Sequence, residues 1–223
     1  METPPAGSAH LDPTRARNRI HHETERIHAV LDEARICHVG LVVDGWPHVL
    51  PTLHVRRGDT LYLHGSAGAR LLAAGRAGRL PICVTVSLLD GLVLARSAFH
   101  HSVNYRSVLV RGLASPVLDE DDKRAVLAAF IDRTASGRSG ACRPANRREL
   151  AATAVLAVAL TDPATQVTLK ARTGGPVDDA EDMALPHWAG VVPVRTVEGA
   201  PEPAEDLVYP SAPISVGISR AGR

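Results

Sequence analysis

Short runs of apolar residues alternate with turn residues over most of the chain. Ile36–Val43 is rich in β-branched residues and ends at Asp44-Gly45, and His48–Val55 continues in the same manner, so the pattern predicts a β-hairpin. The other runs that favour strands are Thr60–His64, 82–95 with an interruption at Asp90-Gly91, 105–117, 154–160, 166–171 and a short final run at 188–193. Antiparallel strands in hairpin order are therefore the main element of this chain.

Two longer segments have the period of a helix. In Arg15–Ala34, apolar residues that include Ile27 and Leu31 recur on one face beneath a coat of charged residues, which predicts one amphipathic helix over this whole range. Acidic residues are favourable at a helix N-terminus, so Asp119 marks the start of a second helix that ends near Thr134. Shorter helices are expected at 69–77 and 148–153.

These elements predict a mainly β protein with a few helices, of the α+β class. Closing the sheet removes the exposed edges that such strands would otherwise offer, so we expect a closed or nearly closed antiparallel barrel with helices at its mouth. A single domain is expected over residues 15–195. We expect a disordered segment, 1–14, before it and a Pro-rich C-terminal extension, 196–223, after it.

Composition and charge argue against several classes of partner and site. The 223 residues include 25 basic and 24 acidic ones, so no net field attracts nucleic acid or an anionic membrane. The three cysteines form no CxxC motif and no His/Cys cluster, which argues against a disulfide framework and a metal site. No membrane span, signal peptide, GxSxG, HExxH, Walker A or GxGxxG motif is found. We therefore expect a cytoplasmic protein whose partners are small molecules or copies of itself.

The segment Tyr62–Arg70 carries the groups that a phosphate requires. A strand ends at Gly65-Ser66 and a helix is expected directly afterwards, so free backbone N–H groups, the Ser66 hydroxyl and the Arg70 guanidinium converge there. The alternative is that Ser66 only caps the helix and that Arg70 is solvated. This segment alone leaves both interpretations open.

A second polar segment, Arg96–Ser107, lies between two strongly apolar strands. It offers two imidazoles, two guanidiniums, an amide, a phenol and several hydroxyls, and ligand-binding groups collect in loops between rigid strands. An ordinary solvated hairpin loop is the other interpretation. Further along, Lys170–Pro176 leads from a basic strand end into a Gly-Gly turn, and Trp188 is either a hydrophobic plug or a platform for a planar ring.

In their order along the chain, these segments resemble one known family. The residues that carry the resemblance are Tyr62-x-His64-Gly65-Ser66-x-x-x-Arg70, Asp90-Gly91-Leu92-Val93-Leu94-Ala95-Arg96, His100-His101-Ser102-x-Asn104-Tyr105-Arg106-Ser107-Val108 and Arg172-Thr173-Gly174-Gly175-Pro176. They are similar to segments of the pyridoxamine 5′-phosphate oxidase-like family, in the branch of flavin-binding split-barrel proteins that includes nitroimidazole-resistance proteins. The resemblance implies a six-stranded antiparallel split β-barrel that forms a homodimer and holds FMN in two clefts between the subunits.

The resemblance also implies roles for individual residues. The strand with Pro51, Thr52 and Leu53 is expected along the isoalloxazine ring, and His64 on the substrate side of the flavin. Ribityl phosphate contacts are expected from Ser66, Arg70, Tyr105, Arg106 and Ser107, because a phosphate dianion needs charge-assisted donors. Arg96 or Arg106 is the candidate near ring N1. Further cofactor contacts are expected from Ser102, Asn104, Lys170, Arg172 and Trp188, and the candidate catalytic residues are His64 and His101.

An FMN-dependent oxidoreductase acting on a small organic substrate is therefore the expected function. The segment Trp188–Arg195 lacks the Arg/His arrangement of true pyridoxamine phosphate oxidases, which argues against vitamin B6 oxidation. Two alternatives remain open. The protein is haem-binding or haem-dependent, with His100-His101 offering axial nitrogens, or it is a non-catalytic flavin carrier or sensor. The sequence does not distinguish FMN from a deazaflavin.

Overall fold

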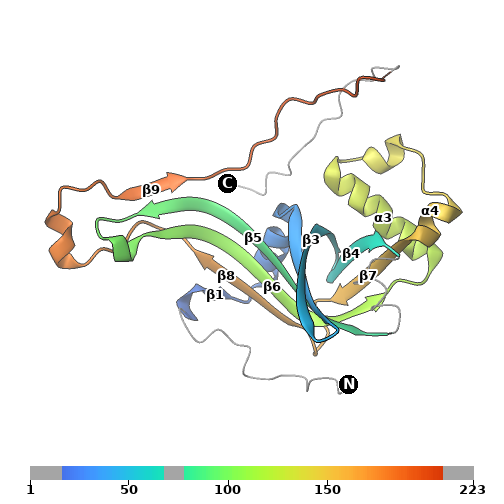
Figure 1. The fold of residues 1–223 in the computed structure, drawn as a ribbon, viewed down its shortest axis with the longest axis horizontal. Helices are drawn as coiled ribbons and strands as arrows, with labels where there is room; N and C mark the ends of the chain where they lie inside the picture. The colour runs from blue at the N-terminus through green and yellow to red at the C-terminus, as the bar shows by residue number, and fades with distance from the viewer. Residues whose placement is uncertain (1–16, 68–77, 208–223) are drawn as a thin grey trace.

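Six strands hydrogen-bond in a ring in the computed structural model, which describes residues 17–67 and 78–207 (Figure 1). Their order is β6-β7-β4-β3-β2-β5, and β5 pairs back with β6. The strands of the ring are β2 (Ile36–Val43), β3 (Trp46–Arg57), β4 (Thr60–Ser66), β5 (Leu80–Leu94), β6 (Ser102–Pro116) and β7 (Thr153–Ala159). All of these pairings are antiparallel. The predicted α+β class and split-barrel architecture are confirmed.

Two long strands divide their pairing between two sheets and so allow the barrel to close. β3 pairs with β2 as far as Leu53 and with β4 from His54 onward. β6 pairs with β5 along most of its length and with β7 only at Ser115 and Pro116. A strand that passes from one sheet to another forms a corner, and the two corners together bend the strands into a split barrel.

Three further strands lie outside the ring, and one of them corrects a prediction. They are β1 (Ile20–His21), β8 (Gln166–Arg172) and β9 (Gly190–Pro193). β8 pairs with β6, β1 pairs with the other edge of β8, and β9 pairs with β5. The single helix predicted over Arg15–Ala34 is wrong in its first half, because a 3-10 helix η2 (Arg17–Arg19) and β1 precede helix α1 (Thr24–Glu33). Ile20 pairs with Lys170, and the hydrogen bonds of this strand edge outweigh the helical period of the local sequence.

The ends of β5 and β6 continue past the ring as an arm (Figure 1). The turn of the arm contains the 3-10 helix η3 (Ala98–His100), and β9 pairs along its β5 edge. The predicted interruption at Asp90-Gly91 is only a bulge, since the strand is continuous and the register shifts between Leu89 and Gly91. A Cβ atom at Gly91 would lie 3.0 Å from Val191 Cγ1, so the small residue is what lets β9 approach β5.

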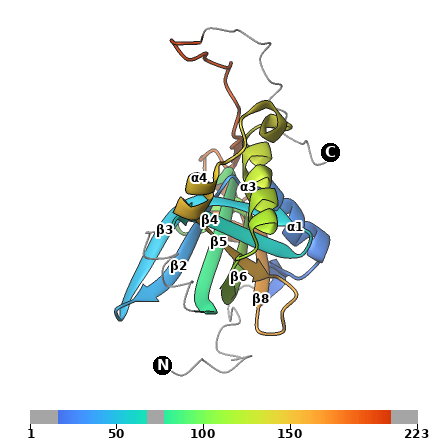
Figure 2. The same cartoon turned by 90° about the vertical axis from the view of Figure 1, so that its right-hand side faces the viewer.

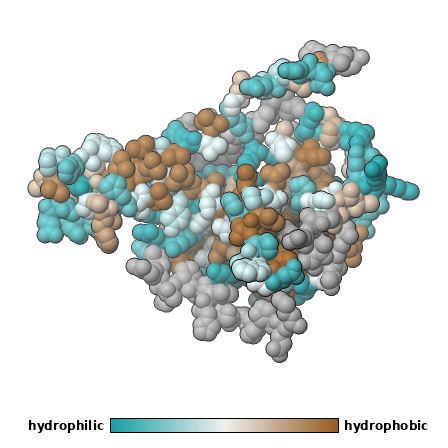
Figure 3. Space-filling model, in the orientation of Figure 1, coloured by the Kyte–Doolittle hydropathy of each residue, from teal (hydrophilic) through white to brown (hydrophobic). Residues whose placement is uncertain are grey.

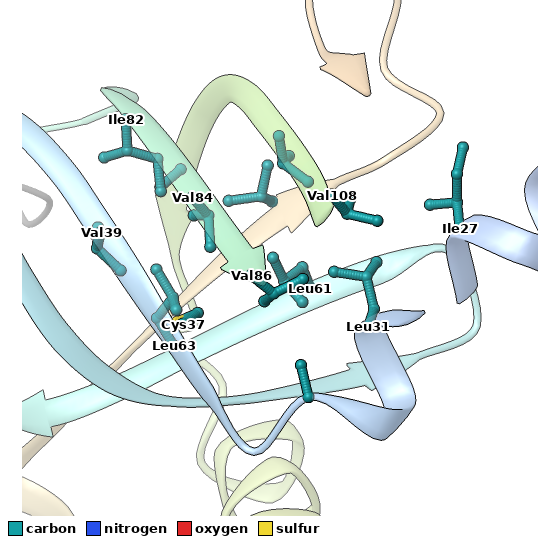
Figure 4. Packing of buried hydrophobic residues seen from close by; sticks show 14 of the residues in the cluster. Ile27, Leu31, Cys37, Val39, Leu61, Leu63, Ile82, Val84, Val86 and Val108 are labelled. Atoms are coloured by element: carbon teal, nitrogen blue, oxygen red, sulfur yellow. The ribbon is translucent and has the colours of Figure 1, made fainter. Parts of the chain in front are cut away.

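The main core fills the ring beneath α1. Side chains from α1, β2, β4, β5 and β6 point toward one another in Figure 4 and belong to one buried cluster. Its labelled members are Ile27, Leu31, Cys37, Val39, Leu61, Leu63, Ile82, Val84, Val86 and Val108. Burying a Val or Leu side chain contributes about 1.5–3 kcal/mol. The alternation of apolar residues along β2, β4 and β5 thus stabilises the ring directly.

The remaining helices are grouped at the other end of the barrel from the arm (Figure 1). They are α3 (Glu120–Thr134), the 3-10 helix η4 (Arg138–Ala141) and α4 (Arg147–Ala152), and a further 3-10 helix, η5 (Ala180–Ala184), lies near the arm. The predicted start of α3 is confirmed, because Asp119 Oδ1 accepts a hydrogen bond of 2.9 Å from the Asp122 backbone N–H. Val126 and Phe130 of α3 pack against Val55 in a second buried cluster.

Some predicted segments cannot be compared with the structure. The expected helix 69–77 and disordered N-terminal segment 1–14 lie outside the described residues, and so does the end of the C-terminal extension beyond residue 207. Among the helices of 17–67 and 78–207, none has the length and apolar character needed to cross a membrane.

Candidate functional site

A polar cluster lies where β6 and β8 run side by side. Asn104 Nδ2 donates a hydrogen bond of 3.0 Å to Gly174 O, and Asn104 Oδ1 accepts one of 2.5 Å from the Arg172 guanidinium. Arg172 also donates to Gly175 O at 3.0 Å. Gly174 has φ +98°, a conformation that favours glycine. The β6–β8 cluster, composed of Asn104, Arg172, Gly174 and Gly175, therefore fixes the shape of the Gly-Gly turn.

Four more predicted contact residues share the β6–β8 sheet. Tyr105 lies opposite Arg172 of the β6–β8 cluster, and Ser107 lies opposite Lys170. Because residues two apart on a strand point to the same side, the Cβ atoms of these two pairs lie on one face of the sheet. Ser107 Oγ donates a hydrogen bond of 3.4 Å to Lys170 O. Ser102 begins β6 at the arm. The structure thus brings together a phenol, a hydroxyl and two cations from strands that are more than sixty residues apart in sequence.

Arg106 lies between two carboxylates. Its Nε and Nη2 donate to Asp90 at 2.9 and 2.7 Å, and its Nη1 and Nη2 donate to Glu33 at 2.5 and 2.8 Å. These hydrogen bonds raise the pKa of Arg106 far above its ordinary value. The side chain ties the end of α1 to the bulge of β5. Its predicted flavin contact remains a prediction, and four N–H groups already have carboxylate partners.

Arg96 has a similar structural partner at the base of the arm's turn. Its backbone N–H and its guanidinium each donate to Asp178 at 2.9 Å, and the Asp178 side chain is 1% exposed. Burial alone would raise the pKa of Asp178, but the hydrogen bonds from Arg96 hold it below its ordinary value. This partly buried ion pair joins the turn of the arm to the segment that follows the Gly-Gly turn.

The two adjacent histidines of the arm have different partners. His100 Nε2 lies 3.2 Å from Asp179 Oδ2, and His101 Nδ1 lies 2.9 Å from Ser97 O. His101 is exposed, and so is the neighbouring Phe99. Across residues 17–67 and 78–207, no three His, Cys, Asp or Glu side chains gather in a way that could hold a metal ion.

The second group of predicted residues lies on β3 and β4. Pro51 and Leu53 are exposed on β3, Thr52 is half-buried between them, and Ser66 is exposed at the end of β4. Ser66 pairs with Thr153 of β7. Arg70, the expected phosphate partner of Ser66, lies outside the described residues, so their predicted convergence is not tested.

His64 is enclosed between β4 and α3. Its ring centroid lies 4.1 Å from that of Phe130, and its Nδ1 is buried with no hydrogen-bond partner among the residues that the structure describes. Burial lowers the pKa of His64, because the protonated imidazole loses its hydration. Burial thus favours the neutral form of this half-buried imidazole beside an aromatic ring.

Sequence reasoning did not single out His54, which is completely buried. Its Nε2 donates a hydrogen bond of 2.8 Å to Leu31 O, since a carbonyl oxygen only accepts. Burial lowers the pKa of His54 from 6.5 to about 4. No clear signal for this was present in the sequence, because β3 crosses from β2 to β4 at this point and the consecutive residues His54 and Val55 are both buried.

Sequence reasoning also missed an apolar outer face on the β2–β3 hairpin. Ile36 pairs with Leu53, and Gly40 with Val49, on the side opposite the core. The exposed apolar residues of this face are Ile36, Val42, Val49 and Leu53, which we call the hairpin patch. A signal was present in the sequence, since β2 and β3 are apolar on both faces rather than on one. Contiguous exposed apolar residues are a common feature of interaction surfaces.

The arm carries a second group of exposed apolar residues. Leu92 pairs with both Val103 and Val192, and all three are about 40% exposed. Figure 3 shows brown, hydrophobic atoms gathered over β5 and β9 on this part of the molecule. Trp188 is 66% exposed beside them, so within one chain it is not a buried plug.

The two groups of predicted residues lie on strands that are not neighbours within one chain. Figure 2 shows the β2–β3 hairpin and β8 on either side of the β5–β6 pair. Strands β2 and β5 therefore lie between the β3 residues Pro51, Thr52 and Leu53 and the β6–β8 cluster. Within one described chain these predicted contacts do not converge on one cleft.

Comparison with protein families identifies the chain. The family model for pyridoxamine 5′-phosphate oxidase matches residues 23–166. The chain belongs to the pyridoxamine 5′-phosphate oxidase family. Its matched residues include α1, the whole barrel and the β6 segment with Asn104, so the resemblance inferred from the sequence is confirmed. A search of curated proteins gives no match.

Solved structures similar to this family member include two that extend over nearly the whole chain. The flavocytochrome Anf3 from Azotobacter vinelandii is 39% identical, with 95% of each chain covered and a TM-score of 0.84. The FAD and haem binding protein from Mycobacterium smegmatis is also 39% identical, with 89% of this chain and 95% of that chain covered and a TM-score of 0.82. A candidate 5-nitroimidazole antibiotic resistance protein from Bacteroides thetaiotaomicron VPI-5482 shares the fold at 24% identity, with 68% and 85% coverage and a TM-score of 0.54.

Proposed function

We propose that this member of the pyridoxamine 5′-phosphate oxidase family is a flavin-dependent redox protein that acts on a small organic molecule. The observation that carries the proposal is the likeness to the two 39% identical proteins, whose names are flavocytochrome and FAD and haem binding protein. A bound flavin supplies hydride or electron transfer. The chain itself supplies placement of the flavin and exclusion of water.

The donors on the described residues fit a flavin nucleotide. Lys170 and Arg172 are cations on one face of the β6–β8 sheet, together with the hydroxyl groups of Tyr105 and Ser107. Such a set suits a phosphate dianion, because charged donors form the strongest hydrogen bonds to it. The exposed Leu53 offers an apolar surface for a ring system. In the proposal, the β6–β8 residues hold the charged end of the cofactor and β3 lies along the ring.

The proposal places the flavin between two copies of the chain. The hairpin patch and the exposed residues of the arm leave apolar surface in water, and a second copy would cover it. Within one chain β2 and β5 separate β3 from β6, and in the proposed two-fold dimer β3 of one copy meets the β6–β8 cluster of its partner. The homodimer and the flavin site are therefore one hypothesis.

Sedimentation and flavin absorbance of the purified protein test this hypothesis together. The variant Val49→Glu places a charge in the hairpin patch and should produce a colourless monomer. Leu118→Glu, at an exposed apolar residue before α3 and away from the patch, is the matched control and should remain a yellow dimer. A wild-type monomer, or a Val49→Glu dimer with full flavin content, would contradict the shared site.

The identity of the flavin is a separate question. The resemblance of the sequence implies FMN, whereas the Mycobacterium smegmatis neighbour is named for FAD. We favour FAD, because that neighbour aligns with 89% of this chain. Heat release of the cofactor followed by chromatography against FAD, FMN and deazaflavin standards decides between them. Turnover with a reduced nicotinamide and a panel of nitro, quinone and imine acceptors separates an enzyme from a carrier or sensor.

Haem binding is the second candidate function, and His64 is the observation that favours it. The half-buried ring lies tilted against Phe130, burial lowers its pKa and so favours the neutral imidazole, and its Nδ1 has no partner within the described part of the chain. His100 and His101, the pair expected from the sequence, each have a contact to Asp179 or Ser97. A neutral imidazole is a common ligand of haem iron. We therefore place the candidate axial nitrogen on His64.

Haem reconstitution of matched variants tests this assignment. A Soret band that is lost in His64→Ala and retained in His101→Ala would support His64 as the ligand. Loss of the Soret band in His101→Ala alone would instead identify His101 of the arm as the haem ligand. Absence of a Soret band in the wild-type protein would contradict haem binding, and it would not affect the proposal of a flavin site. His64 and His101 remain candidate catalytic residues, and a cytoplasmic location remains a prediction from the three free cysteines.

A further inference from the structure

A cavity of about 330 Å³ lies between α3, η4 and the start of α4, in the helical group at the end of the barrel opposite the arm (Figure 1). Its walls are mainly apolar and come from α3, from α4 and from the segment between these two helices, which includes η4. The apolar lining residues are Ala125, Leu127, Ala128, Ile131, Pro144, Ala145 and Leu150. The polar lining residues are Arg124, Ser139 and Cys142. A pocket of this size is at the lower end of the range for small-molecule sites.

The polar groups of the lining have partners within the protein. Ser139 donates through its backbone N–H and its Oγ to the Asp132 carboxylate, each at 2.7 Å. Cys142 Sγ lies 3.7 Å from Ser139 O. These contacts fix the segment that forms the outer wall of the cavity. They also leave an apolar interior, which is a poor environment for water and a good one for an apolar molecule.

Arg124 is the one charged group among the described residues of the lining. Its guanidinium donates to Ala145 O and to Glu120 Oε1, both at 2.7 Å. The carboxylate of Glu120 offsets its charge, so the cavity has no net attraction for an anion. A guanidinium has five N–H groups, and these bonds use two of them, so an uncharged hydrogen-bond acceptor can still be accommodated.

We propose that this cavity binds a small, uncharged, mainly apolar molecule, such as an aromatic ring system with a single oxygen function. The site is separate from the positions proposed for flavin and haem. Val126 and Phe130 point toward the second buried cluster, where Phe130 contacts His64, while Leu127 and Ile131 line the cavity. Because successive helix residues are about 100° apart, these two sets lie on adjacent faces of α3, and neither Phe130 nor His64 lines the cavity. The proposal does not rest on the proposed function.

Binding of 2-naphthol to the full-length protein at pH 7 tests the proposal by isothermal titration calorimetry. The wild-type protein should bind one molecule with a dissociation constant below a millimolar. Ala128→Phe fills the cavity from the middle of α3 and should weaken binding by at least about tenfold. Ala151→Phe is the matched control, since Ala151 is an exposed residue of α4 that does not line the cavity, and its affinity should stay within about twofold of the wild type.

Alkylation of the free thiols provides a second measurement that does not depend on a variant. Cys142 and Cys83 are both free and partly accessible, but only Cys142 lines the cavity. Saturating 2-naphthol should slow the reaction of Cys142 with N-ethylmaleimide and leave that of Cys83 unchanged, as read by peptide mass spectrometry. Absence of binding to the folded wild-type protein would overturn the proposal. So would equal affinity in a folded Ala128→Phe variant, or equal protection of both cysteines.

Discussion

Acidification is expected to destabilise the protein through His54. The imidazole is completely buried, and its Nε2 donates to Leu31 O at 2.8 Å. Burial lowers the pKa of His54 from 6.5 to about 4, and the nearby Arg133 guanidinium acts in the same direction. Between these two pH values the unfolded chain binds a proton that the folded protein excludes. The free energy of unfolding therefore falls as the pH falls from 6.5 toward 4.

The magnitude follows from the two pKa values. The whole shift corresponds to about 3 kcal/mol, and linkage gives a loss of about 2 kcal/mol between pH 7 and pH 5 from this one residue. Burial also lowers the pKa of His64, which adds a contribution of the same sign. A measurement on the wild-type protein alone would therefore combine both histidines.

Urea denaturation of the wild type and of His54→Gln at pH 7 and pH 5 separates the contribution of His54 from that of His64. Glutamine retains a donor for Leu31 O and does not titrate, so the difference in unfolding free energy between the two pH values should shrink by about 2 kcal/mol. His38→Gln, at an exposed residue of β2, is the control and should behave like the wild type. An unchanged pH dependence in His54→Gln would refute the claim that folding holds this imidazole neutral.

Three further substitutions test the contacts that shape the arm and the helices. Gly91→Ala would bring a Cβ atom to 3.0 Å from Val191 Cγ1, so it should cost about 1–3 kcal/mol and accelerate amide exchange in β9; exchange at the wild-type rate would contradict this close approach. Arg106→Met removes four hydrogen bonds to two partly exposed carboxylates and should lower the unfolding free energy, measured in urea, by about 1–2 kcal/mol. Arg106→Lys should recover part of this loss. An unchanged unfolding free energy in Arg106→Met would show that these ion pairs contribute no more to stability than fully exposed ones. Asp119→Ala removes the cap of α3 and should cost about 1 kcal/mol, with a lower Tm as the readout and an unchanged Tm as the contrary result.

Local signals account for much of the fold. The Asp44-Gly45 turn has positive φ at both residues, as the predicted hairpin requires, and Asp119 caps α3 as its position before the acidic run indicated. These features depend on a few neighbouring residues, so the sequence is enough to predict them. The first half of Arg15–Ala34 is different, because its strand pairing depends on β8, about 150 residues further along the chain.

The candidate site was predictable only in part. The motif around Asn104 and the Gly-Gly turn indicated a ligand-binding region, and the structure joins Asn104 to Arg172 through a direct hydrogen bond. Sequence reasoning did not anticipate that Arg106 and Arg96 would be paired with Glu33, Asp90 and Asp178. A guanidinium in a motif shows its charge but not its partner, since partners come from distant strands.

The amino-acid sequence by itself determined the alternating strands, the start of α3 and the membership of the pyridoxamine 5′-phosphate oxidase family, because each depends on residue type and spacing along the chain. Only the tertiary structure decided which polar side chains meet, which imidazoles lose water and which apolar residues stay exposed. The physical reason is that burial and pairing are properties of neighbours in space. His54 and His64 are the same residue type as His101, yet enclosure lowers the pKa of both while His101 lies exposed on the arm.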